Sequence, residues 1–162
     1  FTVTLEYLQP NLGFIKKGYK SYAVQKTEFN AAMSYVLNNA ITGSAPNFTV
    51  DYSLALLSRG NLSGALNPAT DLATAGQVEF TWDDNSAEGN ANATDKAMVL
   101  VYNPSKKESM YIVDGADRTV GSQIITIPST YAGDTVELFM AFISADGTTV
   151  SNSVYLGSGT AA

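Results

Sequence analysis

The chain contains neither cysteine nor histidine in its 162 residues. Without cysteine it has no disulfide and no thiolate nucleophile, and cysteine-based zinc and iron–sulfur sites are excluded. Without histidine it lacks the usual general base at neutral pH, the commonest transition-metal ligand and every Ser-His or Cys-His triad. Because these absences remove most of the common catalytic machinery, we expect a protein that is not an enzyme.

Charged residues are also scarce, at 15% of the chain against roughly 25% in an average soluble domain. Ser, Thr, Asn and Gly supply most of the polar surface, as in many secreted and cell-wall proteins. The net charge of -6 argues against a nucleic-acid partner, because phosphate binding depends on clustered Lys and Arg. No apolar run approaches the ~20 residues of a membrane-spanning helix, so we expect no membrane insertion. These features predict an extracellular or cell-surface protein.

Residues 1–65 are predicted to form an N-terminal segment with two helices and one strand. In the first 17 residues the apolar side chains are three or four positions apart, which indicates a helix that Pro10 kinks. The second helix begins after Thr27, a good N-cap residue, and ends near Asn39. From Phe48 to Leu56 apolar and polar residues alternate, which predicts one half-buried strand.

Residues 66–162 are predicted to form a second domain, because short strands follow one another there. Leu62 to Asp71 is interpreted as a loop. Six strands are then expected at 78–82, 98–102, 110–113, 123–127, 136–144 and 150–156. Asp146-Gly147 is predicted to make a primed two-residue hairpin turn, and Trp82 to fill the core. The expected fold is therefore mainly β with an N-terminal α-helical segment, built on an immunoglobulin- or fibronectin III-like β-sandwich.

The loop from Trp82 to Lys96, WDDNSAEGNANATDK, is rich in oxygen ligands. Its four carboxylates make a candidate calcium site, because clustered oxygens suit that ion, although the spacing is not that of an EF-hand. These residues are Asp83, Asp84, Glu88 and Asp95. The same composition is typical of a solvated acidic loop. Two of its carboxylates could alternatively serve as the acid–base pair of a glycosidase. No cofactor other than calcium is expected.

Carbohydrate binding would require exposed aromatic side chains on which a sugar could stack. Trp82 alternates in phase with Val78 and Phe80, so we expect it to face the core. A sugar-binding surface would then depend on loop tyrosines such as Tyr19, Tyr22 or Tyr131.

Four stretches of the chain resemble the uncharacterised Bacteroidota proteins grouped as domain of unknown function 6266. They are FNAAMSYVLNNAITG (29–43), LLSRGNL (56–62), ATDKAMVLVYNPSKKE (93–108) and AFISADGTTVSNSVYLG (141–157). The resemblance implies a Bacteroidota source, but the family has no established activity from which a catalytic residue could be carried over. Its members typically carry a further N-terminal segment before the position of Phe1, rich in Gly, Lys and Arg, which this chain lacks.

The missing segment suggests processing of the kind used by bacterial surface fibres, in which strands of neighbouring subunits pair. We therefore expect a non-enzymatic extracellular structural subunit, with itself as partner, that self-assembles into a surface filament or layer. A carbohydrate-binding or adhesion module of the cell surface, with a glycan as partner, is the alternative. A hydrolase that uses paired carboxylates is a third interpretation.

Overall fold

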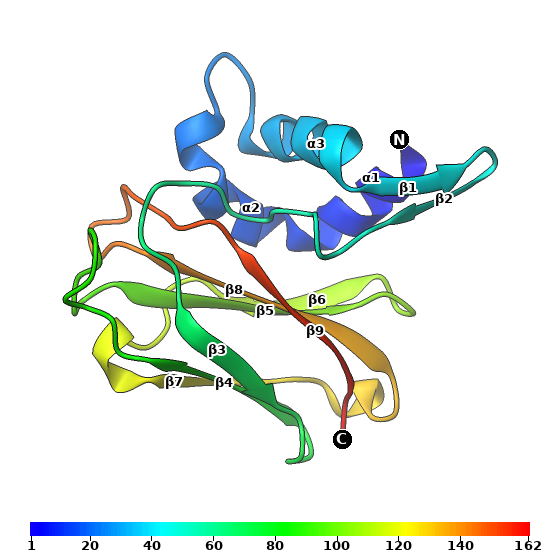
Figure 1. Cartoon of the computed structure of the whole chain (residues 1–162). Helices are drawn as coiled ribbons and strands as arrows, with labels where there is room; N and C mark the ends of the chain where they lie inside the picture. The colour runs from blue at the N-terminus through cyan, green and yellow to red at the C-terminus, as the bar shows by residue number, and fades with distance from the viewer.

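The computed structural model describes all 162 residues and arranges them in three layers. Three α-helices and a small hairpin form the upper layer in Figure 1, a four-stranded sheet forms the middle layer, and a three-stranded sheet forms the lower one. The two larger sheets make a β-sandwich, and the helices cover its outer face. The mainly β fold with an N-terminal helical segment is thus confirmed.

The first helix is interrupted at Pro10, as the sequence predicted. Helix α1 (Thr2–Leu8) and helix α2 (Leu12–Gly18) are joined by the 3-10 turn η1 (Gln9–Asn11). A second 3-10 turn, η2 (Lys20–Tyr22), leads towards α3 (Glu28–Asn39). The Thr27 side chain accepts a hydrogen bond of 3.1 Å from the Asn30 N–H, which confirms it as the N-cap.

The single strand predicted from Phe48 to Leu56 is wrong. Strands β1 (Ile41–Ser44) and β2 (Asn47–Val50) form a two-stranded antiparallel hairpin, and the chain turns directly afterwards. The Asp51 carboxylate accepts hydrogen bonds from the N–H and the hydroxyl of Ser53, at 3.1 and 2.6 Å. This local Asx turn competes with the extended conformation and ends the strand in spite of the alternating pattern.

The sandwich consists of two antiparallel sheets with the orders β3-β4-β7 and β6-β5-β8-β9. The strands of the first are β3 (Leu66–Asp71), β4 (Gln77–Asp83) and β7 (Ser122–Thr126). Those of the second are β6 (Glu108–Ile112), β5 (Lys96–Asn103), β8 (Thr135–Ile143) and β9 (Val154–Thr160). The orders match strands A-B-E and C-F-G of the immunoglobulin-like sandwich, with β6 added beside β5.

Strand β3 lies where the sequence had been interpreted as a loop. It contains Pro68, and its register against β4 shifts between Leu66 and Ala69. Proline is tolerated there because β3 is an edge strand that makes hydrogen bonds on one side only.

The four-stranded sheet is buried on both faces. Alternate residues of β5 and β8 contact the helical layer, among them Leu100 and Phe139, while their neighbours Val99 and Leu138 contact the three-stranded sheet. Strands covered on both faces have nearly continuous apolar sequences, as these two do. Trp82 lies in the sandwich core, as predicted. The N-terminal segment therefore packs as a layer on the sandwich, and the domain boundary between residues 65 and 66 stays a prediction.

The turn at Asp146-Gly147 is longer than the predicted two residues. The Ser144 N–H donates to the Thr149 carbonyl at 2.8 Å, so four residues form the loop, and Gly147 adopts a positive φ of 75°. Strand β9 then begins at Val154 instead of Val150, because the segment before it contacts residues 57–62 instead.

Candidate functional site

The four carboxylates predicted to bind calcium do not converge. Asp83 accepts a hydrogen bond of 2.9 Å from the Asn67 side chain, Glu88 is exposed, and Asp95 is fully buried. Asp84 accepts from its neighbour Ser86, which lowers its pKa, whereas a general acid needs a raised one. No group of three or more acidic residues in the chain is arranged to hold a metal ion. A calcium site in this loop stays a prediction.

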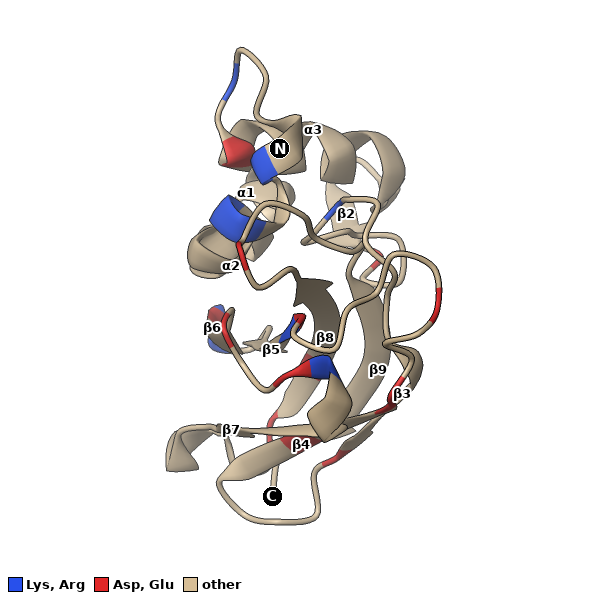
Figure 2. Ribbon diagram, turned by 90° about the vertical axis from the view of Figure 1, so that its left-hand side faces the viewer, with Lys and Arg blue, Asp and Glu red and all other residues tan.

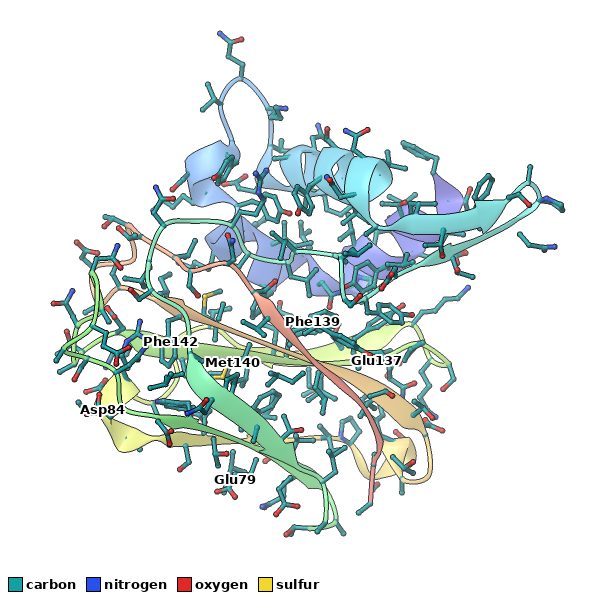
Figure 3. The ribbon with its side chains drawn as sticks, in the orientation of Figure 1. Glu79, Asp84, Glu137, Phe139, Met140 and Phe142 are labelled. Atoms are coloured by element: carbon teal, nitrogen blue, oxygen red, sulfur yellow. The ribbon has the colours of Figure 1, made fainter.

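Arg118 organises this loop from the inside. Its guanidinium is completely buried, donates from Nε to the Asp95 carboxylate at 3.0 Å, and forms an ion pair with the same carboxylate in which Nη2 and Oδ2 are 2.8 Å apart. It lies 4.0 Å from the centre of the Phe142 ring, a strand β8 residue labelled in Figure 3. The remaining donors reach three oxygens, those of the Ser63 and Gly64 carbonyls and of the Asn85 side chain. Because all these groups hold the loop against the sandwich, we interpret the cluster as structural.

A groove with a volume of about 370 Å³ opens between helix α1, strand β2 and the turn after β5. Its wall includes the rings of Tyr7, Tyr52 and Tyr102, and the Tyr7 ring centre is 5.4 and 5.1 Å from the other two. Phe48 lies at the rim and is 43% exposed. A charged pair, Glu6–Lys107 at 3.1 Å, also lines the groove. The combination of aromatic walls and a polar rim is typical of small-ligand sites.

Tyr7 is the unusual residue of the groove. It is 2% exposed, and its buried hydroxyl has no hydrogen-bond partner. Burial raises its pKa well above the ordinary value, so the phenol stays protonated and keeps its donor. A buried polar atom without a partner costs roughly 1–3 kcal/mol, and because this hydroxyl is inaccessible, a ligand in the groove does not reach it in this structure.

Next to the groove, Glu137 on strand β8 accepts a hydrogen bond of 2.6 Å from the Tyr155 hydroxyl. Figure 3 labels Glu137 and Phe139, which lie on the face of β8 under the helical layer. Burial raises the pKa of Glu137, and the hydrogen bond from Tyr155 opposes this effect. The phenol and the carboxyl group satisfy each other, so neither is free for a ligand.

The tyrosines that the sequence suggested for sugar binding are placed differently. Tyr19 and Tyr131 are fully buried and cannot act as stacking platforms, which corrects that prediction. Tyr19 donates to the Leu56 carbonyl at 2.6 Å. Tyr22 is half-exposed, but the Arg59 guanidinium covers one face of its ring.

Strand β7 is one of the two edges of the three-stranded sheet, opposite β3. In Figure 2 no other strand lies beyond it, and its five residues, SQIIT, carry no charge. Ile125 points into the core, whereas Ile124 is 45% exposed. The Ile127 N–H donates to the Gly76 carbonyl of the neighbouring strand, so by antiparallel alternation the backbone groups of Ile124 and Thr126 face outwards. Of these outward groups, the Ile124 carbonyl already accepts a hydrogen bond of 2.8 Å from the Gln123 side-chain amide. An uncharged edge whose remaining backbone groups face outwards is a template for another strand.

Comparisons with known proteins bear on the family more than on the function. A search of curated sequences finds no match. Among solved structures, the chain is similar to the fn3 domain of human collagen alpha-1(XX) chain, at 14% identity and a TM-score of 0.43, over 75% of this chain and 90% of that one. None of the helices is long and apolar enough to cross a membrane. A family model described as "Family of unknown function (DUF6266)" matches residues 1–157, the N-terminal segment and most of the sandwich together, and the chain belongs to this family.

Proposed function

We propose that this protein is a non-enzymatic extracellular structural subunit that self-assembles into a surface filament or layer through strand β7. The observation that supports the proposal is the edge of this strand, which has no charge, no proline and no bulge. Soluble β-proteins normally protect such edges with charges, prolines or bulges, because unpaired backbone groups recruit other strands.

The other three edge strands of the sandwich carry such protection. Strand β3 contains Pro68 and Asp71, and strand β6 begins at Glu108. Strand β9 has a register shift against β8 and a positive φ of 91° at Gly157. Strand β7 has none of these features. We infer that β7 is the edge that pairs with a second copy of the chain.

Symmetry decides whether such pairing gives a dimer or a polymer. Two β7 strands that paired with each other would form an isologous contact, which closes after two subunits. A filament requires β7 to pair with a different edge of the next copy. Strand β9 is the best candidate among the three, because it carries neither charge nor proline and only its irregular register would oppose pairing.

Charge substitutions on the edge test this proposal. Thr126→Lys places a cation on the exposed edge of β7, and Thr130→Lys is the matched control on the exposed turn that follows. We expect the unchanged chain and the control to form polymers in sedimentation velocity and electron microscopy, and Thr126→Lys to stay monomeric with an unchanged circular dichroism spectrum. Val154→Lys should also block growth if β9 is the partner edge. Polymers of unchanged length in Thr126→Lys would refute β7 pairing.

The second candidate function is a carbohydrate-binding or adhesion module, and the groove between helix α1, strand β2 and the turn after β5 favours it. The exposed Phe48 ring and the half-buried Tyr52 ring suit the apolar faces of a sugar, and the exposed Glu6 and Lys107 side chains could bind its hydroxyl groups. A glycan array followed by titration would test it. Phe48→Ala removes the exposed ring at the rim, so it should weaken binding at least about tenfold, equivalent to 1.4 kcal/mol, while the fold stays as stable. Failure of every glycan to bind would dismiss this candidate.

A further inference from the structure

Arg59 is held between two tyrosine rings on the helical layer. The central carbon of its guanidinium is 4.2 Å from the centre of the Tyr22 ring and 4.5 Å from that of Tyr35. The two tyrosines come from turn η2 and helix α3. The Arg59 N–H also donates to the Gly18 carbonyl at 2.9 Å, which fixes the backbone below the side chain. The arginine is therefore oriented before any ligand arrives.

This arginine has no acidic partner in the protein. The four ion pairs of the chain are Lys96–Asp117, Lys106–Asp134, Lys107–Glu6 and Arg118–Asp95, and Arg59 is in none of them. Arg118, the other arginine, is fully buried and neutralised by Asp95. An oriented but unneutralised guanidinium is unexpected in a chain whose net charge is -6.

A pocket of about 410 Å³ opens beside the guanidinium, and its lining suits an anion. A second cation, Lys26, also lines it, and no lining residue is acidic. The other polar side chains of the lining are Ser34, Asn38 and Asn39. The Asn39 amide donates to the Tyr35 carbonyl at 2.8 Å, which leaves its own oxygen available to accept a hydrogen bond.

We propose that this pocket binds the carboxylate of an acidic sugar such as a hexuronate. The rings of Tyr22 and Tyr35 pack against the Arg59 guanidinium, and its planar fork of N–H groups can bind a carboxylate in bidentate fashion. Lys26 adds a second positive charge, and the asparagine oxygens accept hydrogen bonds from sugar hydroxyls. The site lies on the helical layer, whereas β7 lies at the far edge of the sandwich (Figure 1), so it is independent of the assembly proposed above.

Titration of the unmodified protein with D-glucuronate, D-glucose and sulfate, followed by 1H–15N NMR, tests this site. We expect saturable shifts around Tyr22, Tyr35 and Arg59 with glucuronate, and at least tenfold weaker binding of glucose. Glucose binding as tight as that of glucuronate would overturn recognition of the carboxylate. Sulfate binding as tight as that of glucuronate would overturn the assignment to an acidic sugar, because a simple oxyanion would then suffice.

Two variants and one control separate binding from a structural role of the arginine. Arg59→Lys keeps the charge but loses the planar fork, and we expect it to weaken glucuronate binding at least tenfold while the spectrum stays dispersed. Lys26→Gln should weaken binding several-fold, and Lys16→Gln, which removes an exposed cation elsewhere, should not change it. Unchanged affinity in both Arg59→Lys and Lys26→Gln, or the absence of saturable shifts in the unmodified protein, would overturn the proposal.

Discussion

Removal of the Asp95 carboxylate should destabilise the protein strongly, because it leaves Arg118 as an uncompensated buried charge. Both side chains are almost completely inaccessible, at 1% exposure for Asp95 and 0% for Arg118, and they are joined by a hydrogen bond of 3.0 Å and an ion pair of 2.8 Å. In Asp95→Ala the guanidinium would keep only three neutral acceptors and the face of Phe142. Breaking a buried ion pair from one side costs about 3–5 kcal/mol.

An exposed ion pair provides the matched control. Glu6 and Lys107 lie 3.1 Å apart, but their side chains are 45% and 59% exposed. Loss of such a pair costs at most about 1 kcal/mol, because water and salt screen it. Glu6→Ala should therefore leave the free energy of unfolding nearly unchanged under the conditions in which Asp95→Ala reduces it severely.

Urea denaturation and thermal melting would measure both effects. A chain of this size loses about 2–4 °C in Tm per kcal/mol, so Asp95→Ala should lower Tm by about 6–20 °C. Added calcium should leave the Tm of the unmodified protein unchanged, because Asp95, one of the four predicted ligands, already forms an ion pair with Arg118. A loss in Asp95→Ala no larger than that in Glu6→Ala would refute the structural role of the pair. A rise in Tm with calcium that Asp84→Ala abolished would restore the predicted metal site.

Three further predictions concern pH and the layered core. Burial raises the pKa of Glu137, so the protein loses stability as pH rises from the ordinary glutamate pKa through that raised value. Glu137→Gln should therefore unfold at a higher urea concentration than the unmodified protein at pH 7, but not at pH 3.5. Hydrogen bonds from Ser144 and Thr148 lower the pKa of Asp146 to about 2, so its contribution to folding stability is present above pH 3.8 and is lost towards pH 2. In thermal melts, Asp146→Ala should lose this pH dependence. A chain of residues 66–162 alone would expose the face of β8 that carries Phe139, so it should bind a hydrophobic dye and unfold without a cooperative transition, whereas a sharp transition would support a separate domain.

Much of the architecture follows from local sequence patterns. Strands β5 and β8 were predictable because long apolar runs of this length suit strands covered on both faces. Pro10 and Thr27 marked a helix break and a helix start for reasons that act within a few residues. The alternation from Phe48 to Leu56 was misleading because a hydrogen bond from the Ser53 N–H to the Asp51 carboxylate determines the backbone conformation there. Such competition between local structures is not visible in hydrophobic periodicity.

The candidate sites depend on contacts between distant parts of the chain. Arg118 and Asp95 are 23 positions apart and belong to no recognisable motif. The stacking of Arg59 between two tyrosines exists only once helix α3 and turn η2 are packed against the segment that carries it. In each case the sequence shows which residue is present, but it does not show which side chains surround it, because tertiary packing determines those contacts.

The size distribution of the unmodified protein as a function of concentration tests the central claim most directly. Sedimentation velocity with electron microscopy of the same samples would measure it. Pairing of β7 with a different edge predicts species that grow with concentration into filaments or sheets. A monomer at every concentration, or a dimer that grows no further, would contradict the account of this chain as a self-assembling structural subunit.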